Sequence, residues 1–200
     1  MQATRDRKPR PGVAAKKAAT HERIVSSAVA VMRREGLGAA SVERVMRGAG
    51  LTVGGFYAHF ESRDAMDAEV LERTLSDSAR AFLSAPEDPA DTGIKKYLSP
   101  RHRDAANSAC PLPAVLSELT RSPKTTRKAL ANSIEVLAEE YARAYPELPK
   151  GEARSRAMAT LAICVGGLNL ARALKGFASS DEMLEACIRH APGREKSTAS

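Results

Sequence analysis

The segment of residues 41–60, SVERVMRGAGLTVGGFYAHF, predicts two short helices joined by a tight turn. Ser41 is a favourable N-cap for the first helix and Thr52 for the second, because their side-chain oxygens can accept hydrogen bonds from the first free N–H groups. Gly50, between the helices, can adopt the left-handed backbone conformation that such a turn requires. With a preceding helix as its third side, the segment predicts a helix-turn-helix unit.

Side-chain spacing gives the second of these helices an inner and an outer face. The apolar residues spaced to pack back on the flanking helices are Leu51, Phe56 and Phe60. The residues left on the outer face are Val53, Gly55, Tyr57 and Ala58. A short helix with such a face has the dimensions to enter the major groove of DNA.

The rest of the chain also predicts helices. Ala, Leu, Arg and Glu are abundant, aromatic residues are only 4%, Trp is absent, and few runs alternate strictly between apolar and polar residues. Caps, glycines and prolines place helices at 20–36, 62–83, 91–98, 112–121, 123–146, 148–175 and 181–190, with a polar connection at 100–107. We therefore expect an all-α protein.

The positive charge of the chain is confined to its first third. Residues 1–63 hold 12 Lys and Arg against 5 Asp and Glu, which accounts for the whole net charge of +7, whereas residues 64–200 hold 19 of each. This division is expected if the first third contacts a polyanion. A basic tail that only increases solubility is the alternative. Residues 1–19, with prolines, six basic side chains and no hydrophobic period, predict a flexible arm.

Several classes of protein are disfavoured. The three cysteines have no CxxC spacing, so we expect a reducing compartment and no metal site. The longest apolar run, near 160–170, is shorter than the roughly 18–20 residues that a membrane span needs, so we expect a soluble cytoplasmic protein. The histidines are scattered, and no nucleophile–base pair or phosphate loop is visible. We therefore expect no enzyme and no cofactor.

The run GLTVGGFYAHFESRDAM, residues 50–66, resembles the signature of the TetR (tetracycline repressor) family. The resemblance is strong over roughly residues 20–70, and the later part of the chain matches only in helix order and length. It implies a homeodomain-like helix-turn-helix domain at 20–66, an effector-binding and dimerisation domain at 67–190 and a flexible tail at 191–200. It also implies a homodimeric repressor that a small molecule releases from a palindromic operator.

The resemblance assigns roles to individual residues of the DNA-binding segment. Phosphate contacts are implied for Thr52, Tyr57, His59 and Arg63, the last standing where the family usually has Lys. Base contacts are implied for Val53 and Gly55, neither of which can hydrogen-bond a base through its side chain. A methyl contact from Val53, backbone groups, Arg44, Arg47 or the basic arm would have to supply the readout. The alternatives are a half-buried Tyr57, a cationic His59 at a helix end and a solvated Arg63.

The stretch TLAICVGGLNLARAL, residues 160–174, is apolar nearly all round and must be covered on both sides. Leu161, Cys164 and Leu168 form a face expected to pack within the chain. The residues of the other face, expected to contact a second copy in a four-helix interface, are Ala162, Val165, Gly166 and Leu170. The alternative is that the helix is the centre of one subunit's core.

The helices between about 91 and 175 are expected to enclose an effector pocket. Its candidate lining residues are Leu116, Leu119, Ile134, Leu137, Tyr141 and Cys164. Few charges point inward, so an apolar or aromatic effector is expected, acting by tilting the helix at 62–83. Two alternatives remain open: a thiol sensor of oxidants or electrophiles at Cys110, which precedes a helix, and a helical interaction module without DNA contacts.

Overall fold

The computed structural model describes residues 12–84, 88–105 and 110–192, and these ranges contain helices and no strand, as the sequence predicts. The helices are α1 (Val13–Glu35), α2 (Val42–Gly48), the 3-10 helix η1 (Val53–Ala58), α3 (Arg63–Phe82), α4 (Pro89–Tyr97), α5 (Pro100–Asp104), α6 (Leu112–Leu119), α7 (Lys124–Ala142), α8 (Lys150–Ala173) and α9 (Ala178–His190). Within the described ranges, no helix is both long and apolar enough to cross a membrane.

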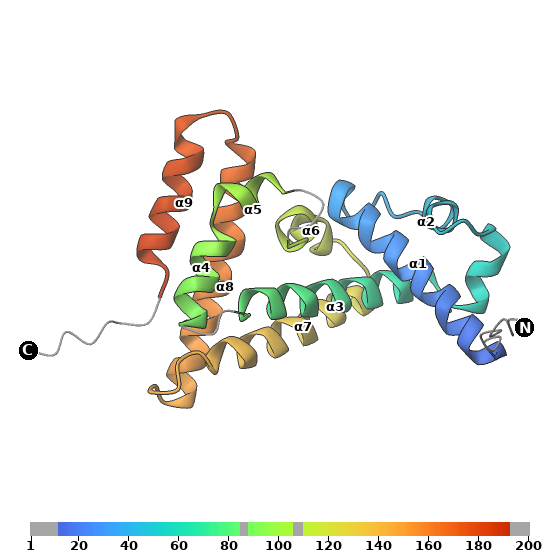
Figure 1. Cartoon of the computed structure of the whole chain (residues 1–200), viewed down its shortest axis with the longest axis horizontal. Helices are drawn as coiled ribbons and strands as arrows, with labels where there is room; N and C mark the ends of the chain where they lie inside the picture. Colours follow the sequence, from blue (N-terminus) through green and yellow to red (C-terminus); the bar gives the residue numbers. More distant parts are fainter. Residues whose placement is uncertain (1–11, 85–87, 106–109, 193–200) are drawn as a thin grey trace, which may run out of the picture.

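The helices form two parts joined by α3 (Figure 1). Helices α1, α2 and η1, called the head below, lie together at one end of the molecule. From the head, α3 runs into the rest of the molecule beside α7, and α9 packs along α8 at the other end. One continuous hydrophobic core extends from Ile24 in the head to Leu184 in α9. The head is therefore packed against the rest of the chain, and not merely tethered to it.

Three helix ends that the sequence predicts are confirmed. The Ser41 hydroxyl accepts a hydrogen bond from the N–H of Arg44, and the Ser62 hydroxyl accepts one from the N–H of Ala65. Helix α1 stops at Gly36, whose φ of 89° continues no right-handed helix.

The start of α1 corrects one prediction. The helix begins at Val13, and Thr20 is not its N-cap but an interior residue whose hydroxyl donates to the carbonyl of Lys16 at 2.9 Å. The reason is composition, because the preceding run VAAKKAA is rich in helix formers. The expected arm is thus helical from Val13, and residues 1–11 lie outside the described part of the chain, as do 193–200 of the expected tail.

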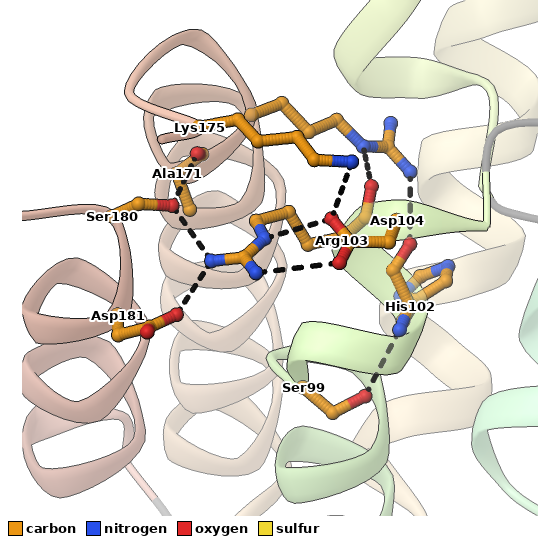
Figure 2. Close-up of polar contacts among 9 residues, drawn as sticks. Ser99, His102, Arg103, Asp104, Ala171, Lys175, Ser180 and Asp181 are labelled. Atoms are coloured by element: carbon orange, nitrogen blue, oxygen red, sulfur yellow. Dashed lines mark hydrogen bonds and ion pairs between the residues drawn. The ribbon is translucent and has the colours of Figure 1, made fainter. Parts of the chain in front are cut away.

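Helix α5 corrects a second prediction, the polar connection at 100–107. Ser99 caps α5 by accepting a hydrogen bond from the N–H of His102, and Pro100 occupies the first turn. Tertiary contacts hold this short helix in place, although it has no buried apolar face (Figure 2). Residues 106–109 lie outside the described ranges.

Arg103 is the centre of these contacts, with only 11% of its side chain exposed. Its guanidinium donates to the Ser180 hydroxyl at 2.8 Å and to the Asp181 carboxylate at 2.5 Å, both on α9. From α8, Arg172 donates to the carbonyls of His102 and Arg103, each at 3.3 Å. These contacts, called the α5 network below, fasten α5 to both α8 and α9 (Figure 2).

Candidate DNA interface

The turn between α2 and η1 has the geometry that the sequence predicts. The Leu51 N–H donates to the Met46 carbonyl at 2.9 Å and the Gly50 N–H to the Arg47 carbonyl at 3.0 Å, which is a Schellman arrangement. Gly50 has a φ of 66°. From α1, Arg23 donates to the carbonyl of Ala49. The free carbonyls at the end of α2 are thereby satisfied and the angle of the turn is fixed.

Alanine substitutions at Gly50, in the turn, and at nearby Gly54 are expected to have opposite effects on stability. Gly50→Ala should lower the free energy of unfolding by about 1–2 kcal/mol, because an L-residue is strained in the left-handed region. Gly54→Ala is the matched control, since its added Cβ meets nothing within 4 Å, and it should stabilise the protein by about 0.4–1 kcal/mol. Urea denaturation measures both, and equal destabilisation would contradict this account.

The element expected to enter DNA is a 3-10 helix, and Thr52 precedes it without making a side-chain cap. Gly54 and Gly55 explain the departure from an α-helix, because consecutive glycines destabilise it. The predicted inner face is confirmed: Phe56 is fully buried and Phe60 is 5% exposed. Their rings stack at 5.3 Å, and His21 of α1 stacks on Phe60 at 4.6 Å.

The outer face of η1 is open to solvent. Tyr57 is 71% exposed and Val53 is 45% exposed. Thr52 and Ala58 are also exposed, whereas Gly55 is half-buried against Met46 of α2. The interpretation of Tyr57 as a half-buried core aromatic is therefore wrong. The outer face of η1 exposes the Tyr57 hydroxyl and the methyl groups of Val53.

His59, at the end of η1, is half-buried. Its Nδ1 atom is buried and has no hydrogen-bond partner among the described residues. Burial, and then the charges of His21 and Lys17, lower the pKa of His59 below its usual value. The ring is therefore mainly neutral at pH 7, which argues against a cationic His59, and a neutral imidazole can still donate one N–H to a phosphate.

Arg63, at the start of α3, contacts the head. Its guanidinium donates to the carbonyls of Leu37 at 3.1 Å and Gly38 at 3.3 Å, and it lies 3.5 Å from the carboxylate of Asp67. Burial raises the pKa of Asp67 to about 6, opposed by Arg63 and reinforced by Asp64 and Glu118. Arg63 therefore positions the loop of residues 36–38, and its side chain is still 41% exposed.

Glu118 of α6 holds the same loop from the other side and was not singled out from the sequence. Its carboxylate accepts hydrogen bonds from the N–H groups of Leu37 at 3.1 Å and Gly38 at 2.6 Å. A single acidic residue in the apolar run LPAVLSEL was the only available signal. The loop is thus bound by Glu118 through its N–H groups and by Arg63 through its carbonyls.

The two arginines considered for base readout are exposed on α2 but ion-paired. Arg44 pairs with Glu35 and Arg47 pairs with Glu43, each at 2.5 Å. Surface pairs of this kind are weak, so either guanidinium can exchange its partner for a phosphate or a base edge.

The sequence-predicted effector residues lie mainly within the packed core and do not share one cavity. Leu119, Leu137, Tyr141 and Cys164 are buried, Ile134 is partly buried and Leu116 is 41% exposed. Two cavities lined by described residues bear on the effector site. One, of about 340 Å³, lies between α3, α4 and α5, and the other, of about 750 Å³, lies between α3 and α7 and includes Leu137 in its lining.

The face of α8 expected to contact a second copy is largely exposed. Ala162, Gly166 and Leu170 are open to solvent, with Leu170 52% exposed, but Val165 is 7% exposed and packs within its own chain. Gly167 lies against α9, where an added Cβ would be 2.5 Å from the sulfur of Cys187. The two adjacent glycines therefore face different neighbours.

Cys110 is a free cysteine, 7% exposed, in the wall of the 340 Å³ cavity. Its backbone N–H donates to the Nε2 atom of His102 at 3.2 Å, so this imidazole is engaged by the main chain. Thiol sensing at Cys110 stays a prediction. Across the described ranges, no group of three His, Cys, Asp or Glu side chains is arranged to hold a metal ion.

Comparison with known proteins supports this arrangement. Residues 24–70 match the family model described as bacterial regulatory proteins, tetR family. NemR of E. coli in its reduced form is 18% identical, with a TM-score of 0.70 over 86% of this chain and 95% of that one. A TetR-family regulator from Cytophaga hutchinsonii is 21% identical, with a TM-score of 0.70 over 87% and 94%. No curated protein matches the sequence.

A transcriptional regulator from Rhodococcus sp. Rha1 is 25% identical, with a TM-score of 0.63 over 86% of this chain and 95% of that one. The family match covers the head from Ile24 onwards and the first part of α3, and these structural matches cover 86% or 87% of this chain. Residues 24–70 therefore match the tetR family of bacterial regulatory proteins, and the described chain shares the fold of the transcriptional regulators that it resembles.

Proposed function

We propose that the protein is a homodimeric repressor that binds a palindromic DNA duplex through η1 and is released by a small-molecule effector. The outer face of η1 carries the proposal: Val53 and Tyr57 are exposed while Phe56 directly behind them is fully buried. This face belongs to residues 1–63, the part of the chain that holds the entire net charge of +7. A rigidly supported element within a positively charged part of the chain suits the major groove.

Each exposed side chain has a role suited to its chemistry. Val53 offers its methyl groups to a thymine methyl, and the lack of a side chain at Gly55 lets the backbone approach a base. Thr52, Tyr57 and His59 donate hydrogen bonds to phosphates, which fix the register of the head on the duplex. Arg63 reaches a phosphate with the part of its guanidinium that does not hold the loop of residues 36–38.

Dimerisation places two heads on one palindrome. We assign the contact to the exposed face of α8, with Ala162, Gly166 and Leu170, together with Phe177, which is 69% exposed between α8 and α9. Exposed apolar side chains of this size are typical of interaction surfaces. Val165 supports the face from within its own subunit.

Effector release requires a link between the helices that follow α3 and the head. Helix α3 spans the distance, and Glu118 of α6 binds the loop of residues 36–38 directly. An effector that binds the free conformation more tightly than the DNA-bound one would shift both elements and weaken DNA binding, and DNA would weaken effector binding by the same factor.

A binding experiment tests the proposal. A palindromic duplex selected from randomised DNA should bind with an affinity that falls steeply with salt, since each phosphate contact releases counterions. Tyr57→Phe and Tyr57→Ala should both weaken binding to the palindrome and to random duplex by about tenfold or more, because each variant loses a hydrogen bond to a charged group. Fluorescence anisotropy at several salt concentrations measures these effects.

Two outcomes would count against it. Loss of discrimination between palindrome and random duplex, with nonspecific affinity unchanged, would assign Tyr57 to base readout instead of phosphate contact. Absence of salt-dependent DNA binding by the unmodified protein would contradict the proposed function as a whole.

A further inference from the structure

The cavity between α3, α4 and α5 combines an apolar, aromatic wall with two cationic side chains. We propose that it is the effector site and that it binds a small organic acid, an apolar or aromatic body with one carboxylate. Its volume of about 340 Å³ lies within the range of small-molecule sites, roughly 300–1,000 Å³. The regulatory consequence rests on the proposed function, whereas binding itself does not.

The inner wall of the cavity is apolar and aromatic. Phe82 of α3 is 6% exposed and stacks on Tyr141 of α7 at 4.4 Å. Tyr97 of α4 meets Phe82 edge to face at 6.2 Å, and His102 of α5 packs edge-on against Tyr97 at 4.6 Å. Such a wall favours a flat, apolar molecule, for which ring contacts add to burial.

The His102 imidazole and the serine hydroxyls of the wall already have partners within the protein, whereas the Tyr97 hydroxyl is buried without a hydrogen-bond partner among the described residues. The Nδ1–H of His102 donates to the Tyr97 carbonyl at 2.7 Å, and its Nε2 accepts the Cys110 N–H, so the ring is held in one neutral form. Burial lowers the pKa of His102, opposed by the Tyr97 carbonyl and reinforced by the charges of Arg172 and Lys96. The hydroxyls of Ser78 and Ser99 donate to backbone carbonyls. Apart from the Tyr97 hydroxyl, the wall thus offers few free hydrogen-bonding groups to a ligand.

The charged side chains of the lining are both cations. Lys96 and Arg101 are exposed, and the described lining residues include no Asp or Glu. The Lys96 ammonium lies 3.4 Å from the Ala81 carbonyl, so it joins α4 to α3 beside the cavity. Because residues 64–200 carry 19 cations and 19 anions, this pair is a local excess in a neutral part of the chain. It complements a single carboxylate on an otherwise apolar molecule.

The position of the cavity connects it to both moving parts of the proposed mechanism. Ser78, Ala81 and Phe82 line it from α3, the helix that begins in the head. Arg101 and His102 line it from α5, which the α5 network fastens to α8 and α9 (Figure 2). An acid that binds here contacts α3, which carries the head. It also contacts α5, which is held against α8 and α9 beside the proposed dimer interface.

The first test compares an acid with its neutral analogue on the full-length protein without DNA. The probes are 2-naphthoate and 2-naphthamide, which share a ring system and differ in charge, with benzoate and octanoate as smaller and linear acids. Since the chain has no Trp, naphthoate emission is read with little protein background. We expect 2-naphthoate to bind about two- to thirtyfold more tightly than the amide, the range that two exposed ion pairs imply.

Matched variants locate the site. Lys96→Gln combined with Arg101→Gln should remove the preference for the acid and leave amide affinity unchanged. Lys95→Gln is the control, because Lys95 pairs with Asp91 at 2.6 Å and does not line the cavity. Ala81→Phe, at an exposed position of the lining, should weaken acid and amide alike by filling the space. Thermal unfolding verifies that each variant is folded.

Equal affinity for acid and amide, retention of the preference in the double variant, or binding that survives Ala81→Phe would overturn the proposal. So would failure of all three acids to bind. Release of DNA by 2-naphthoate is measured separately. Acid binding without DNA release would contradict the proposed induction but support the binding site. DNA binding without acid binding would support the proposed DNA-binding function but contradict the binding site.

Discussion

Replacing Ala162 with arginine is expected to convert the proposed dimer into monomers and to weaken binding to a palindromic duplex by roughly a hundredfold or more, since two linked half-sites bind far more tightly than one. Ala162 is exposed on α8, on the face that includes Gly166 and Leu170. Across a two-fold axis the substitution would place two guanidinium groups in one apolar contact, where unpaired charges are costly. Light scattering gives the mass and fluorescence anisotropy gives the affinity.

The control for this variant is Ala131→Arg, which adds the same charge at an exposed position of α7. It should remain dimeric and keep its affinity for DNA. A dimer mass for Ala162→Arg would place the interface elsewhere on the molecule. Loss of affinity in both variants would show that the added charge, and not the site, is responsible.

Asp67→Asn is expected to stabilise the protein at neutral pH by up to about 3 kcal/mol, the equivalent of a carboxyl pKa raised from 3.8 to about 6. Because the folded state binds the proton of Asp67 more tightly than the unfolded chain does, the protein loses stability as the pH rises from about 4 through 6. The neutral asparagine avoids this loss. The variant and the unmodified protein should therefore differ little below pH 4 and most above pH 6.

Urea denaturation at pH 4.5 and 7.5 measures the difference in the free energy of unfolding. The control on the same helix is Asp77→Asn, whose surface ion pair with Arg80 at 3.2 Å is worth at most about 1 kcal/mol. A difference between Asp67→Asn and the unmodified protein that stayed constant across this pH range would contradict the burial of an ionisable carboxyl beside Arg63.

The features predicted correctly from the sequence are those that depend on neighbouring residues. Ser41 and Ser62 cap helices through contacts within one turn, and Gly50 serves a turn whose hydrogen bonds span five residues or fewer. The inner and outer faces of η1 follow from spacing alone, which is why Phe56 is buried and Tyr57 exposed. The 3-10 form of η1 was missed, although Gly54 and Gly55 already disfavoured a regular α-helix.

The features that could not be predicted depend on residues far apart in the chain. The sequence of α5 has the pattern of a polar connection, because the helix has no buried apolar face. Contacts of Arg103 and Arg172 hold it in place instead. The expected effector residues share the helical period of the core, and periodicity does not reveal where packing leaves a cavity. Lys96 and Arg101 flank this cavity, and no sequence pattern indicates that they lie together.

Gly36 and Glu118 constrain each other's side chains, although Gly36 lies at the end of α1 in the head and Glu118 lies on α6. The Glu118 carboxylate binds the backbone N–H groups of Leu37 and Gly38, and a Cβ added at position 38 would already lie 3.0 Å from that carboxylate. Gly36 is restricted further, because its φ is 89° and an added Cβ would overlap the Glu118 carboxylate. A side chain at position 36 is therefore expected to displace the Glu118 carboxylate and to loosen the contact between α6 and the head.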